Sequence, residues 1–150
     1  MNYIKEYYDE ISSGKIIAGN KIKKIYGKLV KEMDDSSLPF YFDEKKGERP
    51  IQFIETFCRQ SEGQIGEPIK LELFQKAYIQ ALFGFLYRET GARRFNETMF
   101  LVGRKNGKTT MLSAIALYMM IADGEGGAEC YSVATKKDQA AKAFNSACNM

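Results

Sequence analysis

The stretch "TMFLVGRKNGKTT", residues 98–110, decides the fold. Residues 98–102 form a continuous apolar run, which is typical of a parallel β-strand buried on both faces. A short loop with two glycines follows, and residues 108–122 are then apolar nearly all round, which predicts a buried helix. A strand, a glycine-containing loop and a helix in this order are typical of a phosphate-binding loop.

The loop departs from the standard spacing by one residue. The standard form has four residues between its two glycines, followed by Lys and Ser/Thr, whereas Gly103 and Gly107 enclose three. Counted back from Lys108, the standard first glycine falls at Val102. The residues nearest the lysine form most of the backbone cradle, so the pattern still predicts nucleotide binding. A surface turn with Thr109 as a helix cap is the alternative.

The residue types in the loop fit the chemistry of a nucleoside triphosphate. Glycines let backbone N–H groups point inward around an anion, and the N-terminus of a helix favours negative charge. A lysine reaches the β- and γ-phosphates, and a hydroxyl at the helix start is a ligand for Mg²⁺. Gly107, Lys108 and Thr109 supply the glycine, the lysine and the hydroxyl.

The residues after the loop extend the same architecture. "DGEGGA" ends the helix, "ECYSVAT" at residues 129–135 predicts a second strand, and residues 136–150 begin another helix. A strand–loop–helix–strand–helix order predicts an α/β fold, with the parallel sheet and flanking helices of a P-loop NTPase.

Helical spacing of apolar residues dominates the upstream part of the chain. It predicts helices near residues 3–11, 22–33, 51–58 and 73–86, and residues 34–50 form a predicted loop with a short extended piece at 40–42. We therefore expect a helical N-terminal segment over residues 1–70 and the start of the P-loop domain over residues 71–150. Five lysines decorate the second helix: Lys21, Lys23, Lys24, Lys28 and Lys31. Either a DNA-facing helix or a solvated helix face accounts for them.

Composition narrows the class of protein. The 150 residues suit one domain, and the net charge of +3 permits nucleic-acid binding without arguing for it. The absence of histidine removes His-based catalysis and most zinc sites. Cys58, Cys130 and Cys148 are widely spaced, so we expect small buried side chains in a reducing cytosol. The polar N-terminus has no signal peptide, and the apolar run at residues 111–122 is too short to span a bilayer. A soluble cytoplasmic protein without membrane contact is expected.

Three separated segments resemble one family. "RRFNETMFLVGRKNGKTTMLSAIALYMMIADGEGGAECYSVATKKDQA" (residues 93–140) is similar to the ATPase domain of the large terminase subunit of tailed bacteriophages. "GEPIKLELFQKAYIQALFGFLY" (66–87) resembles the adenine-side motif of that family, and "YYDEISSGKIIAGNKIKK" (7–24) is similar to its N-terminal helical segment. The resemblance covers roughly residues 7–150 in the order of the family.

The resemblance implies a role for individual residues. Lys108 would hold the β- and γ-phosphates of ATP, Thr109 would coordinate Mg²⁺, and Gln75 would read the adenine edge beside Phe74. Arg104 or Lys105 would add positive charge near the γ-phosphate, or would face solvent or DNA. The remaining loop residues implied to contact nucleotide are Gly103, Asn106, Gly107 and Thr110.

The family implies a function for the longer protein. It would be an ATPase that drives double-stranded DNA into a capsid from the bacterial host cytoplasm, as a homo-oligomeric ring with the portal protein and the small terminase subunit. An apolar run ending in Asp-Glu, which holds Mg²⁺ and polarises water, does not occur. We expect it, with a nuclease domain, beyond Met150, and expect the 150 residues alone to be inactive. A helicase-like P-loop ATPase and a non-hydrolysing binding or assembly module remain alternatives.

Overall fold

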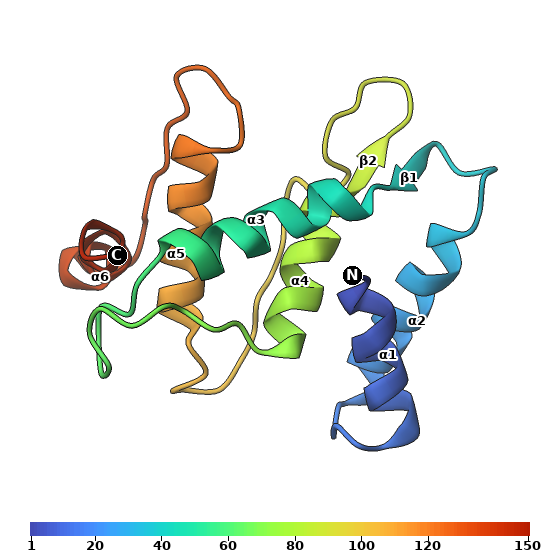
Figure 1. Ribbon diagram of the computed structural model, residues 1–150, viewed down its shortest axis with the longest axis horizontal. Helices are drawn as coiled ribbons and strands as arrows, with labels where there is room; N and C mark the ends of the chain where they lie inside the picture. The colour runs from blue at the N-terminus through green and yellow to red at the C-terminus, as the bar shows by residue number, and fades with distance from the viewer. The chain divides into compact units, whose positions relative to one another are not determined.

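A computed structural model describes residues 1–150, which form two compact units. The first unit comprises Met1–Ile51 and Leu71–Thr98, and the second comprises Gln52–Lys70 and Met99–Met150. The elements in chain order are α1 (Tyr3–Ser13), α2 (Asn20–Met33), β1 (Phe40–Phe42), α3 (Glu44–Phe57), α4 (Leu73–Gly84), β2 (Phe85–Tyr87), α5 (Lys108–Ile121) and α6 (Lys137–Cys148) (Figure 1). No helix combines the length and the apolar character needed to cross a membrane.

The core of the first unit lies where α1 packs against α2 and α4. Ile4 and Ile11 of α1 are completely buried, and the ring of Tyr7 meets that of Tyr26 edge-on at 4.8 Å. The helices predicted near residues 3–11 and 22–33 from the spacing of apolar residues are confirmed as α1 and α2. Gly14 ends α1 with a left-handed backbone (φ 83°), a conformation that glycine adopts without steric cost.

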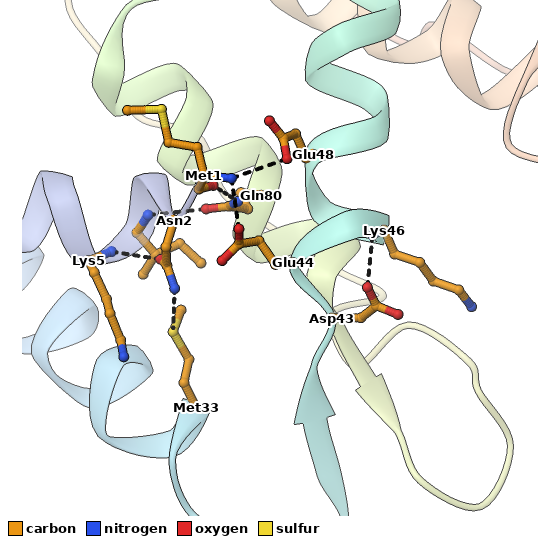
Figure 2. Close-up of polar contacts among 10 residues, drawn as sticks. Met1, Asn2, Lys5, Met33, Asp43, Glu44, Lys46, Glu48 and Gln80 are labelled. Carbon is orange, nitrogen blue, oxygen red and sulfur yellow. Dashed lines mark hydrogen bonds and ion pairs between the residues drawn. The ribbon is translucent and has the colours of Figure 1, made fainter.

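A buried glutamine of α4 holds the start of α1 (Figure 2). Gln80 is fully buried; its Nε2 donates to the carbonyl of Met1 at 2.7 Å, and its Oε1 accepts from the N–H of Ile4 at 3.2 Å. The Met1 amine donates to Glu44 at 2.7 Å and Glu48 at 3.2 Å, and the contact with Glu44 raises the pKa of that amine. An orphaned buried N–H costs about 1–3 kcal/mol, so Gln80 is a structural residue.

Two short strands close the first unit. β1 and β2 pair antiparallel, with Phe40 opposite Tyr87 and Phe42 opposite Phe85. This pairing confirms the extended piece at residues 40–42, and it ends the helix predicted over 73–86 at Gly84. Gly84 passes close to the sheet, since a Cβ there would lie 2.5 Å from the ring of Phe42.

Arg94 ties this sheet to α2. Its guanidinium binds both carboxylate oxygens of Glu32, at 2.7 and 3.3 Å, and lies 3.6 Å from the ring centre of Phe40. The planar guanidinium group of arginine can bind two carboxylate oxygens and stack on a ring at the same time, whereas the ammonium group of lysine cannot. Arg94 is therefore a packing residue of the first unit.

The loop predicted over residues 34–50 is wrong for its second half. α3 begins at Glu44, because the Asp43 side chain accepts from the N–H of Lys46 at 3.0 Å and caps the helix. Pro50 lies inside α3 and is fully buried. The missing N–H of a proline favours a loop in the sequence, but the cap and the burial of Pro50 and Ile51 offset that loss here.

The second unit is built on α5 and α6 (Figure 1). Both helices confirm their predictions, and α5 begins at Lys108, directly after the loop. The Ser113 hydroxyl, which is buried, donates to the carbonyl of Ala143 at 2.8 Å and joins the two helices. Tyr118 of α5 packs edge-on against Phe53 of α3 with ring centres 5.5 Å apart.

The predicted parallel sheet does not occur among these 150 residues. Residues 98–102 and 129–135 carry no strand hydrogen bonds, and β1–β2 is the sheet that the structure contains. Four apolar side chains of these two segments are between 80% and 89% exposed: Met99, Leu101, Tyr131 and Val133. A strand needs a neighbouring strand to satisfy its backbone, and neither segment has one here. The mixed helix and strand content is confirmed; the parallel arrangement is not.

The solvent exposure of the three cysteines depends on where each lies in the structure, and not all of them are buried. Cys58 is buried as predicted, and burial raises the pKa of its thiol. Cys130 and Cys148 are exposed, so the prediction of burial is wrong for these two. Cys130 follows the glycine-rich turn in the unpaired segment 129–135, and Cys148 is the last residue of α6. All three thiols are free.

Candidate functional site

The loop between residues 103 and 107 makes two left-handed turns. Gly107 has φ 64° and ψ 19° and directly precedes Lys108, the first residue of α5. Lys105 has φ 65° and is the one non-glycine residue of the chain with a positive φ. A left-handed backbone costs a residue with a Cβ roughly 1–2 kcal/mol. Such strain clusters at ligand-binding loops, where the surrounding structure maintains it.

The Asn106 side chain holds this loop closed. Its Nδ2 donates to the carbonyls of Gly103 and Arg104, at 3.2 Å each. A Cβ on Gly103 would lie 3.3 Å from the same Nδ2, so glycine leaves room for the contact. The family resemblance implied only that Asn106 contacts nucleotide, and the structure adds these two hydrogen bonds within the loop. An amide side chain between two glycines is the signal that was available.

The start of α5 presents backbone donors to the surface. Gly107 has no side chain to cap the helix, and its carbonyl accepts from the N–H of Met111 at 2.9 Å. The N–H groups of the first helical turn have no intrahelical partner. Lys108 and Thr109 are exposed there, and Thr110 is partly exposed. Unpaired N–H groups, a lysine and a hydroxyl on one helix start fit the phosphates of a nucleotide and an oxygen-preferring cation such as Mg²⁺.

The charge of the loop points the same way. Arg104, Lys105 and Lys108 lie within five residues and are exposed, and no Asp or Glu occurs from residue 98 to residue 122. These cations sit at the positive end of the α5 dipole, where like charge is unfavourable. Repulsion among these cations destabilises the loop when no anion is present. A bound anion relieves that repulsion, which favours binding.

Eight of the sequence-predicted site residues belong to the second unit, and the other two belong to the first. One loop and helix start in the second unit contain Gly103, Arg104, Lys105, Asn106, Gly107, Lys108, Thr109 and Thr110. Phe74 and Gln75 belong to α4 in the first unit. Phe74 is partly buried against the core of that unit.

Gln75 has a structural task that the sequence reasoning missed. It is 7% exposed, and its Oε1 accepts from the N–H of Glu72 at 2.9 Å. The Glu72 side chain accepts in return from the N–H of Gln75, which completes a capping box at the start of α4. The spacing of an acidic residue and a glutamine three positions later was the available signal.

Comparison with known proteins identifies relatives of the chain. The family described as "Terminase large subunit, ATPase domain" matches residues 73–150. The terminase large subunit of Enterobacteria phage HK97 is 36% identical over 107 residues, which cover 70% of this chain and 20% of that protein. The matched stretch thus spans about a fifth of the length of that relative. No solved structure matches the chain.

Replacing Gly107 should reveal the cost of the turn. Gly107→Ala places a Cβ on a left-handed backbone, so the free energy of unfolding should fall by about 1–2 kcal/mol. The matched control is Gly126→Ala, since Gly126 has no positive φ and open space around its Cβ position. Its effect should stay within about 0.5 kcal/mol. Urea unfolding followed by circular dichroism compares the two, and equal stabilities would contradict the turn geometry.

Proposed function

The chain belongs to the terminase large subunit family, and from that premise we propose that it is the N-terminal ATPase part of a motor that moves double-stranded DNA into a bacteriophage capsid. The observation that carries the proposal is the exposed cationic loop before α5, whose helix start is uncapped. The family match begins at residue 73, which supports residues 71–150 as the beginning of the ATPase domain after a helical segment over 1–70.

The loop residues divide the work of binding MgATP. The backbone N–H groups of the loop, from Gly103 through Gly107 and on to Thr110, surround the phosphates. Lys108 neutralises the β- and γ-phosphates, and Thr109 supplies an oxygen ligand to Mg²⁺, which withdraws charge from the phosphates when bound. Asn106 keeps the loop closed through its own two hydrogen bonds, so the donors are placed before nucleotide arrives.

Arg104 and Lys105 supply the charge that a phosphoryl-transfer transition state needs. Negative charge spreads over the oxygens of the γ-phosphoryl group as it is transferred, and cationic side chains stabilise it. We assign this catalytic role to Arg104, with Lys105 as a binding residue, because the left-handed backbone of Lys105 is a strained position typical of ligand contact. The carboxylates that activate water belong in this proposal to a further part of the protein.

The two unpaired apolar segments are proposed as strands of the parallel sheet of the P-loop fold. Residues 98–102 precede the loop and α5, and residues 129–135 follow α5 in the chain. This is the order of a βαβ unit. Their exposed apolar side chains support the proposal, since surfaces of this kind in soluble proteins are normally covered. Strands from elsewhere in the protein would pair with them.

The partners of the motor follow from the family. We propose double-stranded DNA as the substrate, with the portal protein and the small terminase subunit as binding partners and a homo-oligomeric ring at the capsid, in the cytoplasm of the bacterial host. The family assignment favours this function over a helicase-like ATPase.

Lys108→Ala tests nucleotide binding. Hydrogen bonds to charged groups are worth about 1.5–3 kcal/mol, so affinity for a fluorescent ATP analogue should fall by about tenfold to a hundredfold. Lys137→Ala is the matched control, because Lys137 is also an exposed lysine at the first position of a helix in the second unit. The control should bind like the unaltered protein. Unchanged affinity of the Lys108 variant would remove the loop from the nucleotide site.

Gln75→Glu separates the two roles of Gln75. Glutamate also serves in a capping box, so the variant keeps the oxygen that accepts from the Glu72 N–H but loses the amide donor that adenine N7 needs. ATP affinity should fall severalfold, with little change for inorganic triphosphate in a competition titration. An equal change for both ligands, with unaltered thermal stability, would exclude Gln75 from adenine recognition.

A further inference from the structure

Four lysines form an exposed row along α2, which we name the lysine stripe: Lys21, Lys24, Lys28 and Lys31. Their spacing of three, four and three residues puts them on one face of the helix. At a rise of about 1.5 Å per residue, the stripe is about 15 Å long. Lys23 is less exposed and lies outside the stripe.

The opposite face of α2 is already in use. Tyr26 and Leu29 are buried in the core of the first unit, and Val30 and Met33 pack against it. On a helix with 3.6 residues per turn these positions lie across from the lysines. The packing of α2 therefore directs the lysine stripe away from the core.

Little negative charge compensates the stripe. From residue 20 to residue 31 the helix contains no Asp or Glu. Glu32 lies 3.6 Å from Lys28, but it is bound more closely by Arg94 at 2.7 Å. Asp34, at the end of α2, lies 3.5 Å from Lys5. Like charges three and four residues apart repel each other, so the stripe is unfavourable until a polyanion binds.

We propose that the lysine stripe binds the phosphate backbone of a DNA duplex. One strand of a duplex advances about 3.4 Å per phosphate along the axis, so about four phosphates match the length of the stripe. Lysine acts as a point charge and lacks the planar fork that reads base edges, so the contact is independent of sequence. The identity of the duplex rests on the proposed function, and the position of the surface rests on α2 alone.

Other anionic partners fit the stripe less well. A membrane-surface helix inserts its apolar face into lipid, whereas the apolar face of α2 is buried in the protein. Single-stranded nucleic acid is held by stacking on aromatic rings, and the exposed face of α2 has none. Protein interfaces are depleted in lysine and rely on buried aromatic or arginine anchors, which the stripe also lacks.

The test is the salt dependence of duplex binding by the intact protein without nucleotide. Fluorescence anisotropy of a labelled 30-base-pair duplex is measured across a salt series for the unaltered protein and for the variant Lys21→Gln, Lys24→Gln, Lys28→Gln and Lys31→Gln. Glutamine has a helix propensity close to that of lysine, and circular dichroism verifies that α2 is retained. Each lost phosphate contact reduces the slope of log K against log salt by about 0.9, so the slope should fall by about 3 to 4.

The matched control removes four exposed lysines scattered over the chain: Lys45, Lys46, Lys70 and Lys142, each changed to Gln. Its net charge equals that of the stripe variant, so a smaller change in slope attributes binding to the stripe rather than to total charge. An equal change in the control, or no change in the stripe variant, would overturn the proposal. The proposal would also be overturned, in favour of a membrane surface, if the stripe variant lost binding to phosphatidylserine vesicles but retained duplex binding.

Nucleotide titrations separate this surface from the proposed function. The stripe variant should keep its affinity for the fluorescent ATP analogue, and Lys108→Ala should keep the duplex slope. Duplex binding unaffected by the stripe, with normal ATP binding, would overturn the surface and leave the proposed function in place. ATP binding unaffected by Lys108→Ala, with a reduced slope in the stripe variant, would contradict the proposed function and leave the surface in place.

Discussion

The left-handed backbone of Gly107 lets the chain pass from an extended segment into α5 with no side chain over the first helical turn. Lys108 and Thr109 are both exposed at the start of α5. Asn106 fixes the other side of the turn by binding two carbonyls of the loop. A phosphate site needs donors that are placed before the ligand arrives, so this turn suits the nucleotide site that we propose.

The loop before α5 and the lysine stripe on α2 are alike in their charge. Several cations of the first unit are bound to acids, as Arg94 is to Glu32 and Lys15 is to Glu10. Arg104, Lys105 and Lys108 in the loop, and the lysine stripe on α2, lie among few or no acids. Both sites offer exposed positive charge, which in the proposed function suits phosphates of a nucleotide in one case and of a duplex in the other. The motor that we propose needs both.

Much of the local structure could be predicted from the sequence, since it depends on residues near one another in the chain. The helices α1, α2 and α4 follow from apolar spacing, α5 follows from a segment that is apolar nearly all round, and the loop follows from Gly107-Lys108-Thr109. The strands predicted at residues 98–102 and 129–135 do not form among these 150 residues, because a strand is stabilised by hydrogen bonds to a neighbour and neither segment has one here. The start of α3 was missed because the Asp43 cap outweighs the signal of Pro50. The local sequence pattern does not show which of two opposing signals, a helix cap or a proline, prevails.

Backbone amides of the loop give the most direct view of nucleotide binding, because ATP in the proposed site is held by N–H groups as well as by side chains. In ¹⁵N–¹H correlation spectra of the protein, titration with MgATP should shift the amides of residues 104–110, while the amides of the glycine-rich turn at 124–127 stay in place. Saturable binding of MgATP with the amides of Gly107, Lys108 and Thr109 unmoved would contradict the account.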